Sequence, residues 1–134
     1  MNIGFIADNT KKGLLEDFCI AYRGILMDHK LFATGTSGRI IERAANLSVY
    51  KFLAGEIGGD QQMSLFIEQS QLDMLIVFKE PSVSPRDDRN VYTLFKQCDL
   101  YNIPLATNLA TAEMLIKSLE RGDLDWREIY RDNG

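Results

Sequence analysis

Short apolar runs alternate along the chain with longer stretches in which apolar residues recur at helical spacing. The short runs are typical of β-strands, and the longer stretches predict helices. The five predicted strands are residues 2–7, 30–33, 49–53, 74–78 and 103–107. Strands that alternate with helices predict an α/β fold with right-handed crossovers. We therefore expect a single-domain, three-layer sandwich around a central, mainly parallel five-stranded sheet, of the Rossmann or flavodoxin-like kind.

The run at 74–78 is the most hydrophobic of the five. It is predicted to be central, because the strands of a parallel sheet are buried on both faces. The last predicted helices are residues 90–100 and 110–119. After them, the pattern predicts a polar tail that contains Trp126 and ends the chain.

The composition is that of an ordinary globular domain, since 46% of the 134 residues are hydrophobic and 25% are charged. This length suits one domain, 1–134. A net charge of −4 and an isoelectric point near 5.0 argue against binding to nucleic acid, which needs a basic face. No apolar run approaches the roughly 20 residues that span a bilayer, so no membrane is expected as a partner.

The cysteines and the start of the chain predict a cytoplasmic protein. The chain enters its first strand at once, which leaves no room for a signal peptide. Cys19 and Cys98 lie far apart within helical patterns, and we expect two buried thiols, as in a reducing compartment, rather than a disulfide. His29 is the only histidine, which argues against a histidine-based metal site, so no metal is expected.

Residues 34–38, Thr-Gly-Thr-Ser-Gly, form a predicted turn between a strand and a helix. Glycine lets the backbone approach a ligand closely, and hydroxyl and free N–H groups at a helix start suit an anion. Phosphate is the obvious candidate. The alternative is an ordinary turn in which Thr36 or Ser37 only caps the helix.

In parallel sheets, ligands bind beyond the carboxyl ends of the strands, which favours the phosphate interpretation. The turns that this rule gathers at one edge are residues 8–12, 34–38, 54–60, 79–90 and 107–108. Asp60 ends the second glycine-rich turn. It is either the N-cap of the next helix or a general base beside the phosphate site, placed to take a proton next to a carbonyl.

Three segments resemble the signatures of bacterial methylglyoxal synthases. Residues 33–38 are similar to their ATGTTG, residues 58–62 match their GGDQQ, and residues 102–108 match their IP-ATN segment. The order of strands, turns and helices agrees over nearly the whole chain. The resemblance implies an MGS-like domain, a fold that also occurs in effector-binding regulatory domains of carbamoyl phosphate synthetases.

The resemblance implies an enzyme that converts dihydroxyacetone phosphate to methylglyoxal and inorganic phosphate as a homohexamer, with no metal or organic cofactor. It implies that Asp60 abstracts the proton next to the carbonyl. The residues that it implies for binding the phosphate are Lys12, Thr34, Gly35, Thr36, Ser37, Gly38 and Gly55.

The chain departs from the family at several site positions. The family's histidine–aspartate pair is here Asp8 and Asn9, and its loop histidine aligns with Asp87. The other departures are Glu80 for an aspartate, Asn90 for an aspartate, Ala54 for a serine and Glu56 for a proline. We expect His29 to lie at the far edge of the sheet, where it cannot substitute for the missing histidines.

The carboxyls at positions 8, 80 and 87 would make the site markedly more acidic than that of the family. An ionised aspartate only accepts hydrogen bonds, whereas histidine can also donate to a developing enediolate. Either these carboxyls have raised pKa values, or the site does different chemistry. Two functions therefore remain: a methylglyoxal synthase-like lyase with impaired catalysis, or a non-catalytic module that binds a small phosphate ester or inorganic phosphate.

Overall fold

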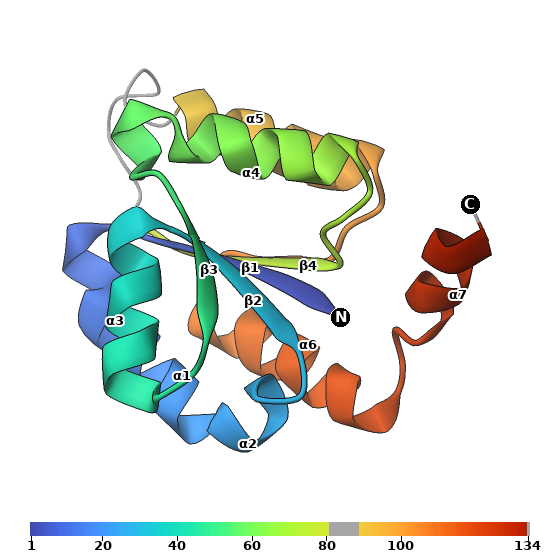
Figure 1. The fold of residues 1–134 in the computed structure, drawn as a ribbon, viewed down its shortest axis with the longest axis horizontal. Helices are drawn as coiled ribbons and strands as arrows, with labels where there is room; N and C mark the ends of the chain where they lie inside the picture. Colours follow the sequence, from blue (N-terminus) through green and yellow to red (C-terminus); the bar gives the residue numbers. More distant parts are fainter. Residues whose placement is uncertain (81–88, 134) are drawn as a thin grey trace.

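The computed structural model describes residues 1–80 and 89–133, in which five strands form one sheet (Figure 1). The strands are β1 (Asn2–Ala7), β2 (Lys30–Thr34), β3 (Val49–Phe52), β4 (Met74–Phe78) and β5 (Leu105–Ala106). Their order across the sheet is β3-β2-β1-β4-β5, and each neighbouring pair is parallel. The predicted α/β class and five-stranded sheet are confirmed, and the pairing is parallel throughout.

Helices cover both faces of the sheet, which gives the three predicted layers. The α-helices are α1 (Lys12–Ala21), α2 (Arg23–Leu26), α3 (Gly35–Ala45), α4 (Gly59–Glu68), α5 (Arg89–Leu100), α6 (Leu109–Arg121) and α7 (Trp126–Asn133). Two short 3-10 helices, η1 (Asn9–Lys11) and η2 (Gly55–Ile57), precede α1 and α4. In Figure 1, α4 and α5 lie on one face, and α1, α2, α3 and α6 lie on the other. None of the helices described is long and apolar enough to cross a membrane.

The pleat of the inner strands divides the core into two clusters. Phe5 and Ile76 pack under α1 and α3, whereas Ile6 and Val77 pack under α4 and α5. All five residues of β4 are buried, as the apolar run predicts. However, β1 rather than β4 is the middle strand, so the carboxyl end of β1 lies at the centre of the ligand-binding edge.

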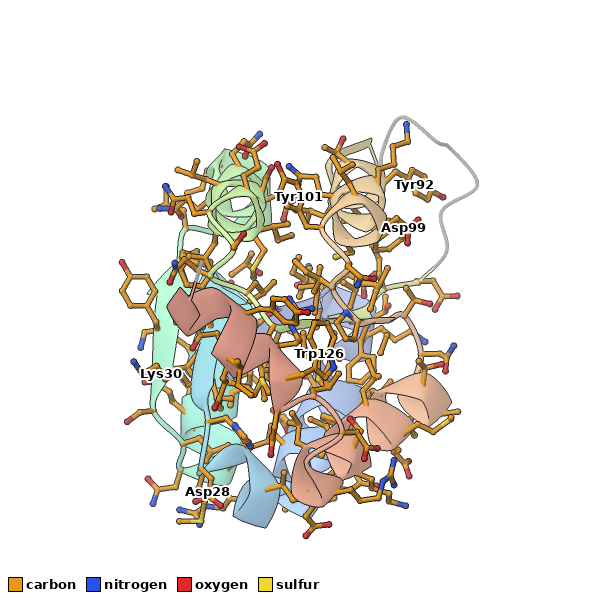
Figure 2. The ribbon with its side chains drawn as sticks, turned by 90° about the vertical axis from the view of Figure 1, so that its right-hand side faces the viewer. Asp28, Lys30, Tyr92, Asp99, Tyr101 and Trp126 are labelled. Carbon is orange, nitrogen blue, oxygen red and sulfur yellow. The ribbon has the colours of Figure 1, made fainter. Side chains whose placement is uncertain are left out.

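The predicted polar tail is wrong, because residues 126–133 form the helix α7. This helix is held by Arg127, whose Nε lies 3.4 Å from Oδ1 of Asp73, a side chain only 3% exposed. The Arg127 guanidinium also donates to the Asn102 carbonyl at 2.6 Å. Figures 1 and 2 show α7 on the side of the molecule where β1 begins, with Trp126 in front of the sheet.

The predictions for the cysteines and the histidine agree with the structure. Cys19 and Cys98 are both buried free thiols. Burial raises the pKa of each thiol to about 12, with a further contribution from Asp99 at Cys98. Nδ1 of His29 lies 3.1 Å from the Met1 amino nitrogen, at the edge where the strands begin. His29 is therefore remote from the carboxyl ends of the strands.

Candidate functional site

A cavity of about 370 Å³ lies at the carboxyl ends of β1, β2 and β4. It is lined by Ile6, Ala7, Asp8, Asn9, Lys12, Thr34, Thr36, Ser37, Ala54, Gly55, Asp60, Lys79 and Val91. The cavity thus brings together residues from four of the five turns that the sequence assigned to one edge. This is where ligands bind in open parallel sheets.

The glycine-rich segment is the first turn of α3 rather than a turn before it. The helix begins at Gly35, and its N-cap residue, Thr34, makes no side-chain capping hydrogen bond. Thr36 and Ser37 lie within the helix, so the interpretation in which either of them caps it is wrong. Because the N-cap side chain makes no capping hydrogen bond, the first-turn N–H groups that follow Gly35 remain available to an anion in the cavity.

Neighbouring backbone holds the start of α3 in place. The Gly35 N–H donates to the Leu53 carbonyl at 3.1 Å, and the buried Ser37 hydroxyl donates to the Ala7 carbonyl at 3.4 Å. A Cβ atom at Gly35 would lie 3.1 Å from the Ala54 nitrogen, so a side chain would crowd this contact. Gly35 therefore acts by close packing and does not itself line the cavity.

Gly38, also a predicted phosphate ligand, does not line the cavity. A Cβ atom at Gly38 would lie 2.5 Å from Cγ of Lys51, a residue of β3. Gly38 therefore allows α3 to pack closely against β3. Its place in the motif is explained by packing.

Asp60 is the second residue of α4 and lines the cavity. The N-cap of α4 is Gly58, with φ of 123°, so the interpretation of Asp60 as the N-cap is wrong. The Oδ1 atom of Asp60 is buried, and a Cβ atom at Gly55 would lie only 3.0 Å from it. The Leu53 N–H donates to Oε1 of Gln62 at 2.6 Å, which ties the first turn of α4 to the end of β3. The carboxylate is thus presented by a firmly placed helix start.

Asp8 is an anchor between the ends of β1 and β4. Its Oδ1 accepts hydrogen bonds from the Thr10 N–H at 3.0 Å and the Thr10 hydroxyl at 2.7 Å, and its Oδ2 accepts from the Glu80 N–H at 2.8 Å. Burial acts to raise the pKa of Asp8, but these hydrogen bonds and the Lys79 charge outweigh it and lower the pKa. Asp8 is therefore ionised at neutral pH, which contradicts the alternative of a raised pKa at this position.

Glu80 does not add its charge to the lining of the cavity, contrary to expectation. Glu80 lies outside the cavity lining, where its 62% exposed side chain pairs with Lys11 at 3.3 Å. Asp87 lies outside the described residues. In the described part of the lining, two carboxylates, Asp8 and Asp60, face two lysines, Lys12 and Lys79.

Lys79 begins the turn 79–90, which the sequence places at this edge, but no individual role was predicted for it. It follows β4 directly, as Asp8 follows β1. Its place after a buried strand was the available signal, but a lone lysine has no motif that distinguishes it from a surface residue.

In the third motif, residues 102–108, the terminal asparagine has a structural role. The Asn108 side chain caps α6 by accepting a hydrogen bond from the Thr111 N–H at 3.0 Å. Asn108 does not line the cavity of about 370 Å³. Thr107 lines a shallower neighbouring hollow of about 200 Å³, which shares Lys79 and Val91 with the cavity.

The fold and the cavity define an α/β protein with a polar cavity at the N-terminus of a helix. The chain belongs to the family of MGS-like domains, whose family model matches residues 16–107. It is 52% identical over 129 residues to the methylglyoxal synthase of Caldicellulosiruptor saccharolyticus, covering 96% of this chain and 92% of that protein. It is 45% identical to the methylglyoxal synthase of Listeria welshimeri, over 99% of both chains.

A solved structure supports the same family. The crystal structure of methylglyoxal synthase from Elizabethkingia anophelis NUHP1 matches with a TM-score of 0.79 and 34% identity, over 86% of this chain and 76% of that one. The resemblance found in the three sequence motifs is therefore confirmed at the level of the family.

Proposed function

We propose that this protein is a lyase of the methylglyoxal synthase type, which eliminates phosphate from dihydroxyacetone phosphate to give methylglyoxal. The observation that carries the proposal is the shared cavity: the Asp60 carboxylate, the uncapped start of α3 and Lys12 all line it. The names of the relatives support the same reaction.

In this proposal, the phosphate group binds at the start of α3. The first-turn N–H groups that follow Gly35 and the Thr34 and Thr36 hydroxyls donate to its oxygens, and Lys12 adds a positive charge. Gly35 and Gly55 contribute by letting the backbone approach closely. A rigid cradle can hold the C–O bond to phosphate in line with the enediolate π system, as elimination requires.

Asp60 then acts as the general base. It takes a proton from the carbon next to the carbonyl, and the electron pair of the broken C–H bond moves onto the carbonyl oxygen to form an enediolate. The hydroxyl on the deprotonated carbon then gives up its proton and becomes the aldehyde, while the carbon–carbon double bond shifts toward the phosphate-bearing carbon and phosphate leaves with the electron pair of the C–O bond. The enolate product gains a proton at its terminal carbon and becomes methylglyoxal, and the hydroxyl proton leaves with phosphate. No metal or organic cofactor enters these steps.

We expect turnover to be slow relative to a site that contains histidine. The ionised Asp8 accepts hydrogen bonds and cannot donate to the enediolate. General acid–base assistance contributes about 10²–10⁴-fold, and this chain has aspartates at positions 8 and 87, where the resemblance implies histidines. The same observation favours the second candidate, a non-catalytic module that binds a small phosphate ester through the same cavity.

Replacement of the proposed base tests the proposal and separates the two candidates. Asp60→Asn should abolish methylglyoxal formation from dihydroxyacetone phosphate and leave calorimetric phosphate binding nearly unchanged. Asp17→Asn, at an exposed site on α1, is the matched control and should keep wild-type activity. An Asp60→Asn variant as active as wild type would refute the base assignment. Phosphate binding without elimination by wild type would favour the binding module.

We infer further that residues 1–134 act as one domain and assemble into a homohexamer. A cytoplasmic location fits the two buried free thiols. The partner is a small phosphorylated metabolite or inorganic phosphate, and neither nucleic acid nor a membrane is part of the proposal.

A further inference from the structure

Lys79 lies across the cavity from the start of α3. The α3 helix follows β2, Lys79 follows β4, and β1 lies between these two strands. Neighbouring strands are spaced by about 4.8 Å, so the two sides of the cavity are about 10 Å apart at this edge. A three-carbon phosphate ester and its hydrogen bonds can bridge such a gap. A phosphate held at α3 therefore directs the other end of the ester toward Lys79.

The backbone of Lys79 is held on both sides. The Asp8 N–H donates to the Phe78 carbonyl at 3.1 Å, and Oδ2 of Asp8 accepts from the Glu80 N–H at 2.8 Å. These bonds fix the residues before and after Lys79 to the end of β1. The lysine thus extends from a defined position, and its side chain is only partly exposed.

The two lysines of the cavity lie on different sides of it and therefore have different roles. Lys12 begins α1, which packs against α3, so Lys12 belongs to the phosphate side. On the β4 side of the described lining, Lys79 is the residue with a positive charge. Asp8 lies beside it with both oxygens already accepting hydrogen bonds. Lys79 is therefore the cation that can stabilise negative charge on the end of the substrate opposite the phosphate.

We propose that the Lys79 ammonium donates a hydrogen bond to the substrate oxygen on which negative charge forms when Asp60 removes the proton. This inference rests on the proposed function. The C–H electron pair ends on that oxygen, the proton ends on Asp60, and Lys79 keeps its own protons throughout. Lys79 thereby supplies the stabilisation of the enediolate that an ionised Asp8 cannot supply.

Binding of two probes tests this assignment without turnover. Inorganic phosphate occupies only the phosphate side, whereas 2-phosphoglycolate also carries a carboxylate where the enediolate oxygens would form. By calorimetry, Lys79→Met should lower the affinity for 2-phosphoglycolate at least tenfold and change the affinity for phosphate less than twofold. Lys12→Met should lower the affinity for both ligands. Lys117→Met, at an exposed site on α6, should change neither.

Kinetics provide the second readout. Lys79→Met should lower kcat for elimination by about 10²-fold, with KM changed much less, and Lys79→Arg should recover most of the loss because it keeps the charge.

The binding results decide the assignment. An equal loss of affinity for both ligands in Lys79→Met, or no loss of affinity for either, would overturn it. Wild type that forms no methylglyoxal would refute the proposed function, while the two affinities would still decide the role of Lys79. Circular dichroism of each variant confirms that the fold is retained, and Lys79→Arg repeats the binding test if Lys79→Met is unfolded.

Discussion

At the scale of single residues, Asp8 illustrates how a substitution in a site changes the role of a position. Where the resemblance implies a histidine, this chain has a carboxylate that joins the ends of β1 and β4 through the Glu80 N–H. The same carboxylate closes the turn at Thr10. Asp8 therefore fixes the site's geometry, and its negative charge faces Lys79.

The anchoring role of Asp8 predicts how stability depends on pH. The pKa of Asp8 is lowered in the folded protein from its ordinary value of 3.8. Its contribution is therefore fully present above about pH 4 and is lost as the pH falls through the folded pKa. Asp8→Asn should lower the free energy of unfolding by about 1–2 kcal/mol at pH 7, and by less near pH 3.

Urea unfolding of wild type and Asp8→Asn at both pH values measures this difference. Asp17→Asn, whose side chain is exposed on α1, should show no such pH dependence relative to wild type. A stability difference between Asp8→Asn and wild type that stays constant from pH 7 to pH 3 would contradict the anchoring role.

Residue-scale prediction from the sequence succeeded where a motif identified the position. The motifs and the edge rule identified Lys12, Thr36 and Asp60, which all line the cavity. Sequence could not indicate that Glu80 pairs with Lys11 outside the cavity, because a side-chain direction depends on its neighbours in space. For the same reason, the edge rule placed the turn 79–90 near the site without giving Lys79 a role.

At the scale of elements, the connection between β3 and α4 determines where Asp60 stands. The Gly59 N–H donates to the Ala54 carbonyl at 2.9 Å, and a Cβ atom at Gly59 would overlap the Leu53 carbonyl oxygen. The obstacle is backbone, which cannot rotate away as a side chain can. Glycine at position 59 is therefore required by the approach of α4 to the end of β3.

A pair of glycine substitutions tests this argument. Gly59→Ala should lower the free energy of unfolding by about 1–3 kcal/mol, because the added methyl group displaces α4 or β3. Gly13→Ala on α1 should raise it by about 0.5 kcal/mol, because nothing lies within 4 Å of that Cβ position and alanine favours a helix. Thermal or urea unfolding measures both. A Gly59→Ala variant as stable as wild type would contradict the close approach, whatever the result at Gly13.

Element-scale prediction depended on local pattern. All five strands were expected within two residues of their observed ends, because apolar runs bounded by polar turns are a local signal. The start of α3 was placed too late, since glycine and threonine are poor helix formers and gave no local signal that the helix already begins at Gly35. The helix α7 was missed because it is held by Arg127 and Asp73, which lie 54 residues apart in the chain.

At the scale of the whole molecule, side chains on one part of the surface suggest where copies of the chain meet. β3 is an edge strand, and α4 packs against it. Tyr50, Leu53, Ile57 and Leu65 on β3, η2, α4 and the connection between them are each more than half exposed. Exposed apolar residues on neighbouring elements indicate an interaction surface more strongly than scattered ones. Symmetric assembly is the usual way in which a soluble chain covers such a surface.

We therefore expect a homohexamer in which this surface is covered. Light scattering at micromolar concentration should report the mass of six chains, and Leu65→Glu should shift the population toward smaller species, because a charge would be buried in the contact. Met114→Glu, at an apolar site on α6 that is 69% exposed against 53% for Leu65, is the matched control and should leave the mass unchanged. A monomeric wild type would refute the assembly. A Leu65→Glu variant that remains hexameric would show that copies meet elsewhere, leaving the open edge of β3 outside the contact.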